Sequence, residues 1–224
     1  MIAHERSDAD EAVPEDEVPA VDGRVPGRRG RRTRDRLLSA TAELLATRSY
    51  RDVKVVDIAR KVGTSPATFY QYFAGVEAAV QLLARRVIED GANLVTPLGE
   101  GRWRGREAWD ASLELVDVFL DFWRDNAAVL RVIDLAIVEG DLRFRDIRND
   151  LLGPVTDELA EAIVERRGAT GEEARAEAAI LVSMMVHVAE HRADFEAWGA
   201  ELATARTRMA EHVHWGVTGR RRRA

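Results

Sequence analysis

Five hydroxyl groups and one carboxamide fall within the short segment 64–72, where they could form hydrogen bonds to another molecule. The carboxamide belongs to Gln71, four of the hydroxyls belong to Thr64, Thr68, Tyr70 and Tyr72, and the fifth belongs to Ser65. A carboxamide can pair with the major-groove edge of adenine, whereas hydroxyls suit phosphate oxygens, which carry no sequence information. The combination indicates a nucleic-acid contact in which Gln71 reads a base and the hydroxyls position the segment.

Two short helices joined by a tight turn are expected to carry these side chains. The first is predicted over 55–62 and the second over 66–73, with Gly63 at the turn because glycine tolerates a positive φ. Ser65 is a suitable N-cap for the second helix, and Pro66 fits its first position, where a missing N–H costs nothing. The pattern predicts a helix-turn-helix whose second helix projects outward.

The charge of the chain is distributed unevenly, which matters for this interpretation. The net charge is −6, but the stretch from Arg24 to Arg86 holds 14 basic and 5 acidic residues, so it carries +9 and the remainder −15. Local positive charge is what phosphate neutralisation requires. The predicted DNA contacts are therefore Arg31, Arg34, Lys54, Thr64, Ser65, Ala67, Thr68, Tyr70, Gln71 and Tyr72.

The segment Ile58 to Phe73, IARKVGTSPATFYQYF, resembles the signature of the TetR family of repressors. The resemblance extends over the N-terminal domain of that family, from Arg34 to about Leu83. It implies an Ω-shaped homodimer with an N-terminal DNA-binding domain and a variable C-terminal domain that binds an inducer and dimerises. Double-stranded operator DNA, a small hydrophobic effector and a second copy of the chain are the partners that it implies.

Two positions depart from the pattern of that family. Lys54 stands where the family usually has a Thr or Ser that caps the first helix of the motif, so the capping hydrogen bond is expected to be lost. The stretch 74–76 holds Ala, Gly and Val where the family tends to place a lysine at the start of the next helix. Operator affinity is therefore expected to depend on Lys54 and on the arginines that precede the motif.

Apolar residues recur at helical spacing from Thr33 onward and no stretch alternates as a strand does, so the fold is predicted to be all-α. The organisation expected is a disordered tail (1–30), a three-helix helix-turn-helix domain (31–83), a larger helical ligand-binding and dimerisation domain (84–217) and a basic tail (218–224). A connection rich in Gly and Pro is expected at 91–105. About nine helices are predicted, over 33–47, 55–62, 66–73, 76–90, 107–124, 127–138, 144–167, 172–197 and 201–215.

The second half of the chain contains a helix with apolar residues on more than one face, as expected for an enclosed helix that lines a ligand pocket. A hydrophobic or amphipathic effector, such as a fatty-acyl or drug-like molecule, is expected there, and the alternative for each residue is ordinary core packing. The predicted ligand-binding residues are Trp109, Leu113, Val116, Phe119, Phe122, Trp123 and Met184.

The last two predicted helices carry small and apolar residues that allow close helix packing, and we expect them to form the dimer interface. The residues concerned are Ala178, Leu181, Val182, Met185, Leu202 and Met209. Effector binding is expected to favour a conformation in which the two recognition helices no longer match successive major grooves, which releases the operator.

Two other functions are considered. His187, Glu190 and His191 match the H-x-x-E-H pattern of some zinc metalloenzymes. Such a site needs a third protein ligand, for which His212 and His214 are the obvious candidates, and the sequence assigns neither of them. A transcriptional activator, or a DNA-binding regulator controlled by a protein partner, would carry the same DNA-binding motif. Transcription measured with and without the gene would separate repression from activation.

Composition excludes several classes of protein. The chain has no cysteine, so disulfides, thiol catalysis and thiolate metal sites are excluded. No Gly-rich phosphate loop or nucleophile elbow is present, and we expect no enzyme activity, cofactor or bound metal. No apolar run could span a bilayer and the acidic N-terminus does not resemble a secretory signal, so a cytoplasmic location without membrane association is expected.

Overall fold

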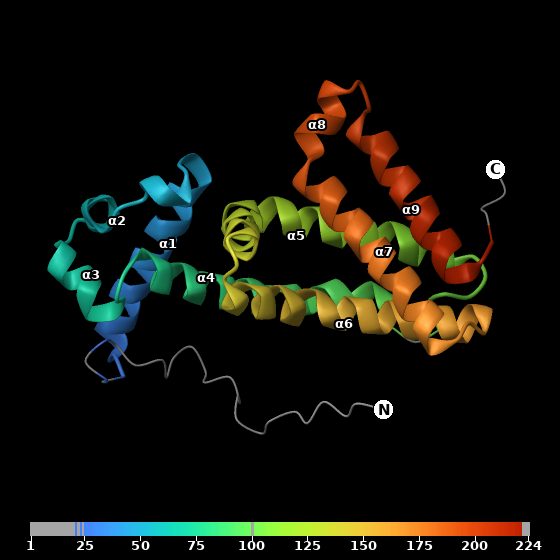
Figure 1. The fold of residues 1–224 in the computed structure, drawn as a ribbon, viewed down its shortest axis with the longest axis horizontal. Coiled ribbons are helices and arrows are strands. Elements are labelled where there is room, and N and C mark those ends of the chain that lie inside the picture. Colours follow the sequence, from blue (N-terminus) through green and yellow to red (C-terminus); the bar gives the residue numbers. More distant parts are fainter. Residues whose placement is uncertain (1–20, 22, 24, 100, 221–224) are drawn as a thin grey trace. The chain divides into compact units, whose positions relative to one another are not determined.

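The computed structural model describes residues 21, 23, 25–99 and 101–220 (Figure 1). Within these residues the fold is all-α, as predicted, with nine α-helices, two short 3-10 helices and no strand. None of the described helices is long and apolar enough to cross a membrane. The chain divides into two compact units, Met1–Leu83 and Ala84–Ala224, which are described separately.

Unit 1 is a small helical bundle that contains the predicted helix-turn-helix. It comprises α1 (Arg28–Thr47), the 3-10 helix η2 (Tyr50–Asp52), α2 (Val55–Val62), α3 (Pro66–Tyr72) and the first half of α4 (Val76–Gly91). Helices α1, α2 and α3 contact one another. Large apolar side chains that are completely buried form the core: Leu37, Leu38, Leu45, Ile58 and Phe69.

Helix α1 begins earlier than the sequence predicts. The prediction placed its start at Thr33 and assigned residues 1–30 to a disordered tail, but the helix begins at Arg28, so this part of the prediction was wrong. The N-cap residue, Gly27, forms no side-chain cap, and no acidic residue lies in the first turn. The start therefore lacks the usual sequence signals. Residues 1–20 of the predicted tail lie outside the described residues.

Unit 2 is built around one long helix, α5 (Glu107–Val138). Helix α5 contacts the 3-10 helix η3 (Ala92–Leu98) and three of the later helices, α6, α7 and α9. Its buried aromatic rings lie close together: Phe119 stacks on Trp123 at a centroid distance of 4.5 Å. The remaining helices are α6 (Leu142–Arg167), α7 (Gly171–Glu190), α8 (Arg192–Ala197) and α9 (Leu202–Thr218).

Two parts of unit 2 are divided into helices differently from the prediction. The predicted helices 107–124 and 127–138 form the single helix α5, in which the Asn126 side chain donates to the Phe122 carbonyl at 3.0 Å. No glycine or proline lies at this point to end the helix. The predicted helix 172–197 is divided at His191, whose φ and ψ of −109° and 29° are not helical. The basic tail predicted from 218 begins where α9 ends, and residues 221–224 lie outside the described residues.

Helices α6 and α7 form an antiparallel hairpin with well-defined ends. Gly168 ends α6 with a φ of 65°, and Thr170 caps α7 by accepting the Glu173 backbone N–H at 3.3 Å. In return the Glu173 carboxylate accepts the Thr170 backbone N–H at 3.1 Å, which completes a capping box. This hydrogen bond, followed by the one from the Thr170 hydroxyl, lowers the pKa of Glu173 below its usual value. The hairpin holds α7 in a fixed register against α6.

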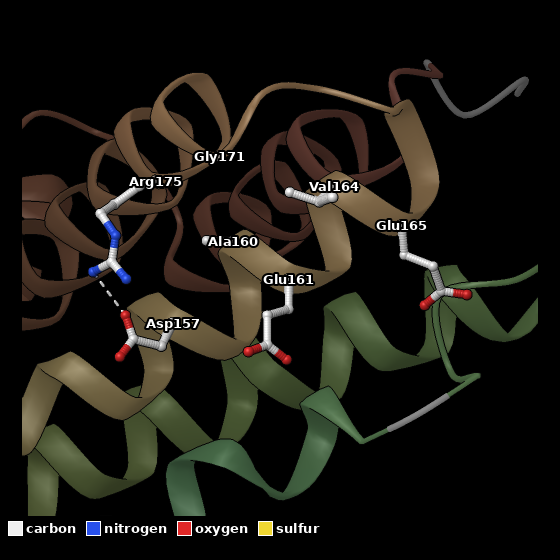
Figure 2. A pocket seen from close by; sticks show the side chains of 7 residues that line it. All are labelled: Asp157, Ala160, Glu161, Val164, Glu165, Gly171 and Arg175. Atoms are coloured by element: carbon white, nitrogen blue, oxygen red, sulfur yellow. Dashed lines mark ion pairs between the residues drawn. The ribbon is translucent and has the colours of Figure 1, made fainter.

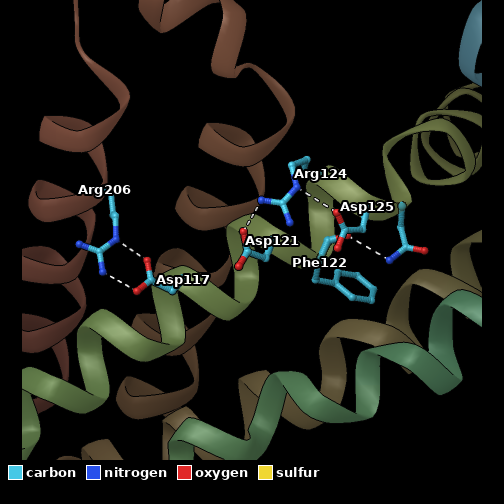
Figure 3. Close-up of polar contacts among 7 residues, drawn as sticks. Asp117, Asp121, Phe122, Arg124, Asp125 and Arg206 are labelled. Atoms are coloured by element: carbon cyan, nitrogen blue, oxygen red, sulfur yellow. Dashed lines mark hydrogen bonds and ion pairs between the residues drawn. The ribbon is translucent and has the colours of Figure 1, made fainter.

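Charged side chains also tie the helices of unit 2 together. Arg206 of α9 donates two hydrogen bonds to the Asp117 carboxylate of α5 (Figure 3). Arg148 of α6 pairs with Asp134 of α5 and, at 3.4 Å, with Glu190 of α7. Bidentate and multiple contacts of this kind fix orientation because they constrain both partners. The relative positions of α5, α6, α7 and α9 are thus set by polar as well as apolar contacts.

Candidate nucleic-acid interface

The turn between α2 and α3 is built on a glycine with left-handed backbone geometry. Gly63 has φ 73° and ψ 38°, and it ends α2. Its N–H donates to the Arg60 carbonyl at 3.1 Å, and the next N–H, of Thr64, donates to the Ala59 carbonyl at 2.9 Å. These bonds satisfy carbonyls that the helix end would leave free. Because a side chain is strained at this φ, glycine is needed to redirect the chain into α3.

The start of α3 is fixed by Ser65 and Pro66, as the sequence predicts. The Ser65 Oγ accepts the Thr68 backbone N–H at 3.2 Å, and Pro66 occupies the first helical position. The Thr68 hydroxyl lies 3.1 Å from the same Ser65 Oγ. Both side chains therefore hold the N-terminus of α3 in place, although both were predicted as DNA contacts.

The packing of Phe69 determines which face of α3 is exposed. The Phe69 ring is completely buried and lies 5.2 Å from the Phe73 ring, centroid to centroid. Tyr70, which follows it, is 51% exposed, and Gln71 is also exposed. Ala67 is exposed on the same short helix. The structure thus presents the predicted base-reading side chain to solvent on a helix anchored by one aromatic ring.

Polar contacts hold α2 against α1. The Arg36 guanidinium donates to the Val62 carbonyl at the end of α2 at 2.7 Å, where the helix leaves carbonyls free. Lys61 pairs with Glu43 of α1 at 2.8 Å. Together with the buried core, these contacts hold α1 and α2 together, and the two helices support α3.

The predicted cationic contacts lie in different environments. Lys54 is exposed at the N-cap of α2 and forms no side-chain cap, which matches the departure noted in the sequence. Arg31 is half-buried, and Arg34 is only 3% exposed. Arg34 lies one helical turn before the buried Leu37 and Leu38, so it shares their inward face. The structure therefore does not present Arg34 to DNA.

Two features of this surface differ from the sequence analysis or were not found by it. Arg28, Arg29 and Arg32, among the arginines expected to support operator affinity, are exposed on the first turns of α1, whereas the first helix was predicted to begin only at Thr33. In addition, the Val21 backbone N–H donates to the Gln71 carbonyl at 3.1 Å, which brings the segment before α1 to the end of α3. No signal in the sequence indicated this second contact. Tyr72 and Thr64 are half-buried.

Four of the seven predicted ligand-binding residues lie in the interior of unit 2. Six of the seven are on α5 and one is on α7, and these two helices contact each other. The Trp123 indole is 2% exposed, and its Nε1 has no hydrogen-bond partner in the structure. The buried members are Val116, Phe119, Phe122 and Trp123, whereas Trp109, Leu113 and Met184 are half-buried.

The predicted dimer residues mostly face the interior of the chain that carries them. Five of the six are at most 4% exposed, and Leu202 is half-buried. The exposed side of α7 carries other residues, of which Ile180 is 65% exposed. A helix with apolar residues on two sides gives no sequence signal for which side meets a partner. The five buried residues are Ala178, Leu181, Val182, Met185 and Met209.

The zinc arrangement considered from the sequence is incomplete in the structure. The rings of His187 and His191 stack at a centroid distance of 4.3 Å, and Glu190 pairs with Arg148. Among the residues that the structure describes, no three metal-ligating side chains lie together in a way that could hold an ion. The two histidines alone do not provide the three protein ligands of a catalytic zinc site.

A groove of about 600 Å³ lies between α6 and α7 (Figure 2). Its walls carry the acidic residues Asp157, Glu161 and Glu165, and Arg175 crosses it to pair with Asp157 at 2.8 Å. A second, smaller groove lies between α1 and α2. Neither groove is lined by any of the predicted ligand-binding residues.

Comparison with known proteins identifies both units. The model of the Bacterial regulatory proteins, tetR family, matches residues 37–78, and the model of the Tetracyclin repressor-like, C-terminal domain, matches residues 94–224. The second match alone covers more than half of the chain. No curated protein matches the sequence significantly.

Solved structures with a similar fold include three bacterial regulators. The fatty acid degradation regulator FadR from Bacillus halodurans has 18% identity and a TM-score of 0.59, with 88% of this chain and 99% of that one covered. A TetR-family regulator from Mesorhizobium loti has 17% identity and a TM-score of 0.59, with coverages of 86% and 96%. Another from Haemophilus influenzae has 13% identity and a TM-score of 0.56, with coverages of 85% and 99%. With a helix-turn-helix in unit 1 and a repressor-like helical domain in unit 2, the chain belongs to the TetR family of DNA-binding transcription regulators.

Proposed function

We propose that the protein is a repressor that binds a palindromic operator as a homodimer and leaves it when a small hydrophobic effector binds unit 2. The observation that carries the proposal is the geometry of α3. The turn at Gly63 and the buried Phe69 ring aim Tyr70 and Gln71 outward from a supported helix. Helices presented in this way enter the major groove, and a two-fold dimer places two of them about one DNA turn apart.

Within this interface the side chains have separate roles. Gln71 reads a base, while Tyr70 and Lys54 contact phosphates, because a phenol and an ammonium suit anionic oxygens. Arg28, Arg29 and Arg32 extend the phosphate contacts along the start of α1, as exposed arginines do on DNA. Selection of bound duplexes from a random pool tests the proposal, which requires an inverted repeat among the selected sequences.

Replacement of Gln71 is expected to change sequence preference. In the Gln71→Ala variant one bidentate base contact is lost, so discrimination at a single position in each half-site should fall by about 1–3 kcal/mol. In the Arg28→Ala variant, binding to all duplexes should weaken uniformly and the salt dependence should become shallower. Selection from the random pool combined with salt titration distinguishes the two. Unchanged base preference in Gln71→Ala would contradict the role of Gln71.

The effector proposal is supported by the buried indole of Trp123. A buried N–H without an acceptor costs about 1–3 kcal/mol, and a ligand oxygen beside it would remove this cost. The ring itself lies among Phe119 and Phe122, which suit an apolar chain. The similar structure from Bacillus halodurans is described as a fatty acid degradation regulator. We propose an amphipathic effector of the fatty-acyl class, with an oxygen acceptor near Trp123 Nε1.

The Trp123→Phe variant is expected to bind operator as the unchanged protein does. Its response to palmitate should be at least about tenfold weaker, because one hydrogen bond of roughly 1.4 kcal/mol to the ligand is lost. Thermal shift and operator release measure the response. Trp103→Phe is the matched control, because Trp103 is also buried with an unpartnered Nε1 but lies outside the predicted set. Equal responses of both variants to palmitate would contradict the assignment.

We further propose that the dimer uses the exposed side of α7 rather than the buried residues named from the sequence. Ile180 is a large apolar residue exposed on α7, and Ala176, Ala179 and Ser183 lie exposed beside it at helical spacing. Small residues around one aliphatic side chain allow a second helix to approach closely. An isologous contact at this surface would bring the two copies of α7 together.

A further inference from the structure

The chain that precedes α1 returns to the end of α3. The Val21 backbone N–H donates to the Gln71 carbonyl at 3.1 Å. The start of α1 also lies close to the end of α3, since a Cβ at Gly30 would lie 3.4 Å from the Tyr72 hydroxyl oxygen. Residues 1–20 are therefore joined to the protein directly beside its DNA-reading surface.

The charge of residues 1–20 is opposite to that of the surface at which they are attached. They contain seven carboxylates and one arginine, so their net charge is −6 with histidine neutral. Arg28, Arg29 and Arg32 are exposed at the start of α1 and have no acidic partner among the described residues. No acidic residue lies in the first turn of α1, where free N–H groups add positive potential.

We propose that residues 1–20 bind the basic start of α1, beside the exposed face of α3, and compete there with DNA. The proposal rests on the proposed DNA-binding role of α3. An extended segment of this length reaches about 66 Å, more than twice the roughly 30 Å length of α1. Tethering gives the segment an effective concentration on the order of millimolar, so weak ion pairs are enough to occupy the surface.

This competition changes how DNA binding depends on salt. DNA binding releases cations from the duplex, but displaced carboxylates of residues 1–20 take cations up again, so the net release is smaller. The segment therefore lowers affinity for every duplex at low salt and makes the salt dependence shallower. At high salt the segment no longer lowers DNA affinity, because ionic screening weakens its binding to the basic start of α1 as well as the binding of DNA.

The test is a full-length variant in which all seven carboxylates of residues 1–20 are changed to amides, Asp→Asn and Glu→Gln. We expect its affinity for a nonspecific duplex to rise by about tenfold near 0.05 M salt and the plot of log affinity against log salt to be steeper. The two proteins should converge as salt increases. Deletion of residues 1–20 should give the same result, and the deleted segment added as a free peptide should inhibit this shortened protein.

A control variant separates this effect from a change in total charge. It changes seven exposed carboxylates of unit 2 to amides: Asp110, Asp146, Glu158, Glu161, Asp194, Glu196 and Glu201. An equal rise in affinity in this control, or identical affinity and salt slope in the unchanged and neutralised proteins, would overturn the proposal while leaving DNA binding established. Absence of binding by all of these proteins would instead count against the DNA-binding role of α3.

Discussion

The Phe69→Ala variant is expected to lose about 3–5 kcal/mol of the stability of unit 1 and, with it, operator binding. Phe69 is completely buried, and its ring contacts those of Tyr70 and Phe73 at centroid distances of 5.9 and 5.2 Å. Removing a buried phenyl ring loses its transfer free energy and leaves a cavity. Since small units are stable by only about 5–15 kcal/mol, this loss is a large fraction of the total.

Urea unfolding followed by circular dichroism, together with operator titration, measures both losses. Tyr70→Ala is the matched control on the neighbouring position of α3. Because Tyr70 is 51% exposed, its removal should change stability by at most about 1 kcal/mol while still weakening DNA binding. Equal destabilisation by the two variants would show that Phe69 does not anchor the helix in the way the structure indicates.

The Ile180→Asp variant is expected to be monomeric at concentrations at which the unchanged protein is dimeric. In an isologous interface one substitution appears twice, so two carboxylates would be buried facing each other without partners. A cost of about 4 kcal/mol corresponds to a roughly thousandfold weaker dimer. Operator affinity should fall in parallel, because one recognition unit alone contacts only half of the site.

Light scattering during gel filtration, combined with operator titration, tests this expectation. Val138→Asp introduces the same charge at another aliphatic residue, which is 84% exposed at the end of α5. This control should remain dimeric and bind operator normally. A dimeric Ile180→Asp protein would place the interface elsewhere on unit 2.

The helix-turn-helix could be predicted almost to the residue because its signals are local. Gly63, Ser65 and Pro66 determine the turn and the start of α3 through backbone geometry and capping, which depend on neighbouring residues alone. The predicted bounds of α2 are those observed, and the end of α3 differs by one residue. Local chemistry of this kind is readable in a single sequence.

Features that depend on packing could not be predicted from the sequence in the same way. The burial of Arg34 follows from the side of α1 that meets the rest of unit 1, and a basic run gives no indication of that side. The predicted dimer residues, including Leu181 and Met185, are apolar because they fill the core of unit 2. The same pattern is expected for an interface, so only the structure separates them.

The contact between Val21 and Gln71 shows a further limit. It joins backbone atoms 50 positions apart in the sequence, so the identity of neither residue indicates it. A backbone hydrogen bond has no residue preference beyond the exclusion of proline as donor. Such contacts can be identified only from the folded structure.

The most direct test of the central claim is DNA cleavage by a reagent attached at position 71. The chain contains no cysteine, so Gln71→Cys creates a single labelling site for an iron chelate that generates hydroxyl radicals. Asp146→Cys, exposed on α6, is the control. If α3 lies in the major groove, the label at position 71 cleaves two points of the selected operator, one in each half-site and about one DNA turn apart. Diffuse cleavage, or equal cleavage from position 146, would contradict the account.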